Sequence, residues 1–141
     1  MSIAPLAEPL SCDLLPADLS ADEDVRMQVW GLLAAMYPQT PAGERRRERR
    51  YPFPHLIRLT PVAADGRTPC GESIVVVGKH LSERGLGFYH AQPLPYRKMI
   101  AAVESPNGQW LSFLVDLNWC RFTKHGWYET GGRLLAATEP P

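Results

Sequence analysis

Short apolar stretches separated by glycine, proline and asparagine fill the chain from residue 53 to residue 135. Alternating or continuous apolar runs of this length, bounded by turn residues, are typical of β-strands. Asp65-Gly66 and Pro106-Asn107-Gly108 are the clearest turns. Because six short strands with exposed edges would be prone to pair with other chains, the pattern predicts closure into a small antiparallel barrel. The expected strands are 53–62, 72–78, 85–90, 96–104, 109–122 and 127–135.

Two details of the expected strands bear on their environment. The run Ile74-Val-Val-Val77 is β-branched and almost continuous, which predicts a strand that is buried on both faces. Glycines at 85 and 87, and again at 131 and 132, lie inside strands. Glycine within a strand indicates a bulge or a close approach of backbone to another group.

A helical period precedes the strands. Apolar residues recur at helical spacing from Val25 to Tyr37, and Pro38 stops the run. Ser20 with Glu23 three positions later forms a capping-box pattern. We therefore expect an amphipathic helix over about 21–37, after an irregular arm over 1–19. Its apolar stripe is expected to pack against the strand domain, with a dimerisation helix as the alternative.

These patterns predict a mainly β fold with one N-terminal amphipathic helix. The domain organisation we expect is an N-terminal arm and helix over 1–43, a β-barrel domain over 44–136 and a C-terminal tail over 137–141. A chain of 141 residues is large enough to bury a core in one domain.

Composition narrows the class of protein. No apolar run approaches the length of a membrane span, and the first residues lack the basic and apolar regions of a signal peptide. Cys12, Cys70 and Cys120 are far apart and form no Cys-x-x-Cys pair, which favours reduced thiols in a cytoplasm over a zinc site or disulfides. The formal net charge of zero disfavours general nucleic-acid binding. We expect a cytoplasmic protein without membrane insertion.

No catalytic pattern is visible in the sequence. The four histidines do not follow a metal-ligand spacing, and none stands beside a serine or cysteine nucleophile motif. A phosphate-binding loop and a dinucleotide-binding glycine fingerprint are also absent. We therefore expect no enzymatic activity, no catalytic residues, no metal and no cofactor. The histidines are His55, His80, His90 and His125.

Charge is concentrated in one segment just before the first expected strand. Five arginines lie between residues 45 and 50, out of 15 Lys and Arg in the chain. Guanidinium groups bind phosphate oxygens in pairs, stack on flat rings and pair with the O6 and N7 atoms of guanine. Alone, such a run could be a solvated charge cluster or a basic arm for nucleic acid. These arginines are Arg45, Arg46, Arg47, Arg49 and Arg50.

A second segment, 79–85, lies in a turn between two expected strands. The Ser82 hydroxyl can hydrogen-bond a phosphate or a base, and Gly85 allows close approach of the backbone to a ligand. A ligand could therefore be held between the mobile arginine segment and this turn. Which use the arginines serve depends on whether the two segments meet.

Together the two segments resemble the PilZ domain, the bacterial receptor module for cyclic di-GMP. The family signature is Arg-x-x-x-Arg before the first strand, followed by Asp or Asn-x-Ser-x-x-Gly between the next two strands. Arg46-Arg-Glu-Arg-Arg50 fits the first half, and the pair Arg45 and Arg49 is a register-shifted alternative. The resemblance covers about residues 44–136 and implies a six-stranded barrel.

The second half of the signature fits as His80-Leu-Ser82-Glu-Arg-Gly85. Ser82 and Gly85 match the family pattern, whereas His80 stands where the family has Asp or Asn. That carboxylate or amide accepts hydrogen bonds from guanine, and a neutral imidazole offers only one acceptor nitrogen. An unpaired donor costs about 1–3 kcal/mol. The departure therefore predicts weaker nucleotide binding or a different pose, unless His80 stacks on a base.

The resemblance implies a non-enzymatic receptor domain that binds cyclic di-GMP and signals through a partner protein. Arg46 and Arg50 would contact phosphates and the guanine edge, while Ser82 and the Gly85 amide would meet the ligand from the turn. The alternative is a degenerate PilZ barrel that serves only as a protein-interaction module without nucleotide binding. A third hypothesis is nucleic-acid binding by the arginine segment.

Overall fold

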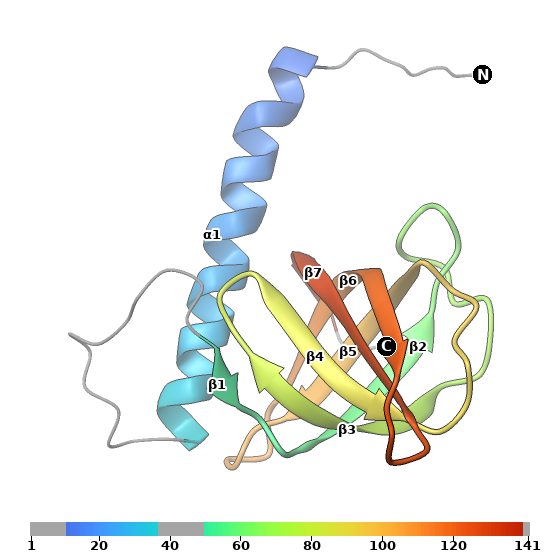
Figure 1. The fold of residues 1–141 in the computed structure, drawn as a ribbon. Helices are drawn as coiled ribbons and strands as arrows, with labels where there is room; N and C mark the ends of the chain where they lie inside the picture. Colours follow the sequence, from blue (N-terminus) through green and yellow to red (C-terminus); the bar gives the residue numbers. More distant parts are fainter. Residues whose placement is uncertain (1–10, 37–49, 140–141) are drawn as a thin grey trace.

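The structure, a computed structural model, describes the backbone of residues 11–36 and 50–139 and the side chains of residues 23–36 and 50–139. Within these ranges a single helix is followed by strands that wrap into a barrel (Figure 1). The elements are α1 (Ser11–Met36), β1 (Tyr51–Pro52), β2 (Leu56–Pro61), β3 (Ile74–Leu81), β4 (Gly85–His90), β5 (Lys98–Glu104), β6 (Trp110–Phe122) and β7 (Tyr128–Thr138).

The sheet closes on itself, so the expected antiparallel barrel is confirmed. Neighbouring strands follow the order β1-β3-β2-β5-β6-β7-β4, and a further pairing of β3 with β4 joins the two ends into a six-stranded ring. All of these pairings are antiparallel. The short strand β1 is an addition to the ring and pairs with the end of β3.

The strand expected over 53–62 is shorter than expected, since β2 covers Leu56–Pro61, and the separate strand β1 precedes the expected range. Tyr51 and Pro52 pair with β3, and the chain resumes strand geometry only at Leu56. Pro52 and Pro54 explain the interruption because proline has no backbone N–H to donate to a neighbouring strand. Between the two strands, the Phe53 side chain is fully buried and anchors the chain to the core.

Alternating side chains of the strands fill the barrel. Phe53, Phe88 and Phe113 are among the largest fully buried side chains. The expectation that 74–77 is buried on both faces is wrong. Val76 points inward, but Val75 and Val77 are 62% and 47% exposed, because nothing among the described residues covers the outer face of the barrel there.

The helix begins at Ser11, ten residues earlier than expected, so residues 11–19 are helical and Ser20 is not a cap. Three leucines and Ala17 in this stretch are strong helix formers, which favours the earlier start. Val25, Val29, Leu32 and Leu33 join the same buried cluster as the barrel core, which confirms the expected packing. No described helix combines the length and apolar character needed to cross a bilayer.

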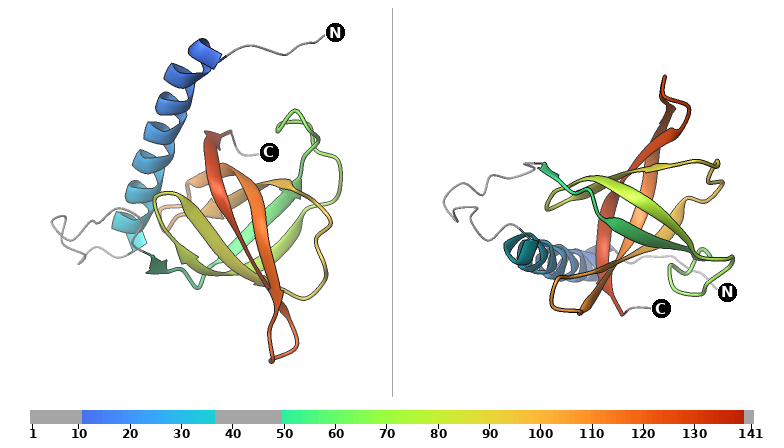
Figure 2. Two further views of the ribbon diagram at one scale, coloured as in Figure 1. Left: turned by 45° about the horizontal axis from the view of Figure 1, so that its top comes forward. Right: turned by 90° about the horizontal axis from the view of Figure 1, so that it is seen from below.

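Figures 1 and 2 show α1 lying alongside the barrel, with its N-terminal half extending past the barrel end. Of the strands, β7 makes the most extensive contact with the helix.

The packing predicts very different effects for two phenylalanines of strand β6. Phe113 is 1% exposed and Phe122 is 63% exposed. Replacing Phe113 with alanine should lower the free energy of unfolding by about 3–5 kcal/mol, because a large cavity would form in the core. Phe122→Ala should change it by less than about 0.5 kcal/mol. Urea unfolding curves of both variants measure the difference, and equal losses would contradict this assignment of the core.

Candidate functional site

One cleft, with a volume of about 350 Å³, lies on the outer face of the barrel and contains residues from both segments that the sequence singled out. Arg50 lines it together with His80, Ser82 and Gly85 of the second segment. The arginines at 45, 46, 47 and 49 lie outside the described residues. The structure therefore brings four predicted site residues together. The full lining is Arg50, His80, Ser82, Arg84, Gly85, Leu86, Asn118, Trp119, Gly132 and Arg133.

The pairing of β1 with β3 explains why Arg50 reaches the turn. Tyr51 pairs with Leu81 and Pro52 with His80 in antiparallel register. Extending this register by one residue places Arg50 opposite Ser82. A two-residue strand thus fixes the last arginine of the basic run beside the turn.

The turn between β3 and β4 is held by its own hydrogen bonds. The Ser82 amide donates to the Gly85 carbonyl oxygen at 2.9 Å, and the Gly85 amide donates to Ser82 Oγ at 3.1 Å. The Arg84 amide also donates to Ser82 Oγ, at 3.3 Å. Ser82 is buried, so its first role in this structure is to shape the turn. Any contact of its hydroxyl with a ligand would be shared with these bonds.

A row of four residues crosses the barrel next to the turn. His80 of β3 lies opposite Gly87 of β4, Gly87 opposite Gly131 of β7, and Gly131 opposite Trp119 of β6. A Cβ atom on Gly87 would lie 2.5 Å from His80 Cε1, and one on Gly131 would overlap the Trp119 indole. The glycines therefore leave room for both rings to lie over the strands. The glycines within the expected strands predicted this close approach of another group to the backbone.

Two bulges shape this surface. The register of β6 against β7 shifts between Leu117 and Trp119, and that of β3 against β4 shifts between Gly78 and His80. In a regular strand, adjacent side chains point to opposite faces, so Asn118 and Trp119 could not both line one cleft. The β6 bulge removes that restriction, as bulges beside functional sites often do. Asn118 and Trp119 are both exposed.

The cleft is positively charged. Arg50, Arg84 and Arg133 line it, and no carboxylate is among its described lining residues. Arg133 lies opposite Asp116 on β6, but Asp116 is engaged by Arg97, with 2.5 Å between Nε and Oδ1. The hydrogen bond from Arg97 lowers the pKa of the Asp116 carboxyl. The Arg133 guanidinium therefore forms no ion pair among the described residues.

His80 is biased towards its neutral form. Burial of the ring lowers the pKa of His80 below its usual 6.5, and the Arg50 and Lys79 charges lower it further, against an opposing effect of Glu129. The imidazole therefore carries no charge near neutral pH. It contributes a flat surface and one acceptor nitrogen to a site whose positive charge comes from arginine.

Sequence reasoning missed Arg84, Asn118, Trp119 and Arg133. Arg84 could have been found, because it lies inside the second motif. The other three lie on β6 and β7, and only the pairing of β6 with β7 and of β7 with β4 brings them to the turn. The glycines at 131 and 132 were the one available signal.

No family model, curated protein or solved structure matches this chain. Among the described residues, no three His, Cys, Asp or Glu side chains are grouped in a way that could hold a metal ion. Flat rings beside several guanidinium groups suit an anionic ligand that carries planar bases.

The proximity of Arg50 and His80 can be tested without any ligand. The imidazole of His80 should titrate below 6.5, and Arg50→Gln should raise its midpoint because one nearby positive charge is lost. Arg67→Gln, which removes an exposed arginine that is not among the causes of this shift, should leave the midpoint unchanged. Histidine ring signals followed by NMR against pH give both values. An unchanged midpoint in Arg50→Gln would show that the two side chains are not neighbours in solution.

Proposed function

We propose that this protein is a non-enzymatic receptor of the PilZ type that binds cyclic di-GMP and passes the signal to a partner protein in the cytoplasm. The observation that carries the proposal is the convergence of Arg50 with His80, Ser82 and Gly85 in one cleft. Those four residues match the two halves of the family signature, apart from the departure at His80. Trp119 and two further arginines in the same cleft support the proposal independently of the signature.

The lining residues suit the two chemical parts of cyclic di-GMP. Its phosphates are anionic, and Arg50, Arg84 and Arg133 can bind their oxygens in pairs. Its guanines are flat. The Trp119 indole, which lies over Gly131, offers a ring on which a base can stack. Stacking of this kind is worth about 1–3 kcal/mol per base. Arg46, which lies outside the described residues, would add a second arginine from the signature.

Asn118 supplies what His80 lacks. In the family, the Asp or Asn at the position of His80 accepts hydrogen bonds from the guanine edge. Asn118 brings a carboxamide, with an acceptor oxygen that has two lone pairs, to the same cleft from strand β6. We propose that this amide reads the guanine edge and that His80 acts as a flat neutral neighbour.

The arginine assignment predicts specific losses of binding. Isothermal titration with cyclic di-GMP should show binding to the unmodified chain, and Arg50→Ala should weaken it about 10- to 100-fold through loss of hydrogen bonds to charged phosphate. Arg46→Ala should have an effect of the same order. Arg67→Ala serves as the matched control and should bind normally. Absence of heat with the unmodified chain at tens of micromolar nucleotide would contradict the proposal.

The assignment of Asn118 predicts a rescue. Asn118→Ala should weaken binding about tenfold, because a buried guanine donor loses its acceptor. Adding His80→Asp to that variant should restore affinity, since a carboxylate at the family position can accept the same hydrogen bonds. If Asn118→Ala binds normally and His80→Asp alone strengthens binding, the missing acceptor is not replaced by Asn118.

A specific observation favours the alternative, a barrel that acts only as a protein-interaction module. A second cleft of about 490 Å³ lies over β3 and β4, lined largely by apolar side chains that include Val75, Val77, Tyr89 and Trp127. Leu56, opposite Val77 on β2, extends the exposed apolar surface. A partner complex that forms equally without cyclic di-GMP and with Arg50→Ala, but is broken by Val75→Asp, would favour this function.

A further inference from the structure

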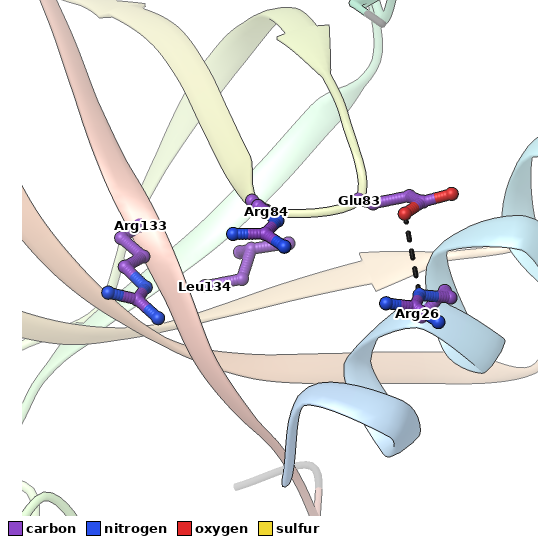
Figure 3. Close-up of a pocket in the computed structure, with 5 residues that line it drawn as sticks. All are labelled: Arg26, Glu83, Arg84, Arg133 and Leu134. Carbon is purple, nitrogen blue, oxygen red and sulfur yellow. Dashed lines mark ion pairs between the residues drawn. The ribbon is translucent and has the colours of Figure 1, made fainter. Parts of the chain in front are cut away.

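The carboxylate of Glu83 projects from the cleft turn towards helix α1. It accepts a hydrogen bond from Trp30 Nε1 at 2.5 Å, and its other oxygen lies 3.4 Å from Arg26 Nε. Figure 3 shows Glu83 and Arg26 pointing towards one another from the turn and from the helix. The Glu83 side chain is 13% exposed, so the carboxylate is largely shielded from water, whereas the Arg26 side chain is 45% exposed. Glu83 lies between Ser82 and Gly85, inside the second motif.

The same tryptophan also contacts the neighbour of the first motif. The Trp30 ring packs edge-on against Tyr51, with 5.6 Å between ring centroids and an angle of 78°. Tyr51 directly follows Arg50 and is paired with Leu81. Trp30 therefore contacts the chain immediately beside both segments that form the cleft.

The space around Glu83 lies where the turn meets the helix, and it is too small for a second binding site. The hollow lined by Arg26, Glu83, Arg84, Arg133 and Leu134 has a volume of about 20 Å³, which is room for about one water molecule. Arg84 and Arg133 line this hollow (Figure 3). Both residues also line the larger cleft. A shift of the turn that moves the Arg84 side chain would therefore also disturb the contacts of Glu83 with the helix.

We propose that Trp30 and Glu83 are positioning residues that hold the two cleft segments in their binding arrangement, and that nucleotide binding is thereby coupled to helix α1. This inference rests on the proposed function for the identity of the nucleotide. Coupling between two sites is reciprocal, so a helix contact that strengthens binding must itself be strengthened by binding, by the same factor. Binding of the nucleotide in the cleft should then stabilise the packing of helix α1.

The first test uses the chain without nucleotide. Trp30→Phe removes the indole donor but keeps a ring against Tyr51. Amide hydrogen exchange at Ser82 and Gly85 should become about five- to tenfold faster, because the turn loses its tie to the helix. The matched control is Trp110→Phe, which replaces a tryptophan of β6 that is 38% exposed. This variant should leave the exchange rates of the Ser82 and Gly85 amides unchanged. Unchanged exchange at the turn in Trp30→Phe would overturn the positioning role, whatever the chain binds.

The second test adds cyclic di-GMP. Trp30→Phe should weaken binding about five- to tenfold. Saturating nucleotide should slow exchange of the amides of residues 23–36 by about the same factor in the unmodified chain, and not in Trp30→Phe. Glu83→Gln, which keeps an acceptor oxygen for the indole, should bind more tightly than Glu83→Ala. The barrel amide of Phe113 should be unaffected by Trp30→Phe, which separates positioning from general destabilisation.

The outcomes distinguish this inference from the proposed function. Fast turn exchange in Trp30→Phe with no binding of cyclic di-GMP by the unmodified chain would support the positioning role and reject the nucleotide. Tight binding that is indifferent to Trp30→Phe, with no protection of residues 23–36, would support the receptor function and overturn the coupling.

Discussion

The pairing of Tyr51 with Leu81 is the contact on which the site depends. Without it, the chain before Phe53 would have no strand pairing to hold Arg50 beside the turn. With it, the backbone before Phe53 runs antiparallel to the end of β3, and Arg50 is delivered to the turn that follows that strand. Phe53, fully buried, and Trp30, packed against Tyr51, hold this short strand from both sides. Local strand geometry thus creates the site from two segments that are distant in sequence.

The surface of the cleft depends on the absence of side chains. Gly87 and Gly131 form a directly opposed pair on β4 and β7, and the rings of His80 and Trp119 lie over them. Any Cβ at either glycine would push a ring outwards, into the space that a base would use. Closure of the barrel therefore does more than remove sheet edges, because it sets rings from β3 and β6 on the two sides of a glycine strip.

Much of the fold could be predicted from the sequence, because strand period and turn chemistry are local. Strand β4 runs over 85–90 as expected, and β6 begins one residue later than expected. The errors have physical causes. Prolines delayed the start of the first expected strand to Leu56, and helix formers before Ser20 outweighed a capping signal. The apolar run at 74–77 proved to have an exposed face. Periodicity cannot report what covers a sheet.

The candidate site was predictable only where its residues belong to a compact motif. Arg50, Ser82 and Gly85 follow from short spacings, whereas Asn118 and Trp119 reach the cleft through a bulge that only the pairing of β6 with β7 reveals. The structure of this chain crystallised with cyclic di-GMP tests the central claim most directly. The account predicts a guanine stacked on Trp119 and a phosphate within hydrogen-bond distance of Arg50. A nucleotide bound elsewhere on the barrel, or none at all, would contradict it.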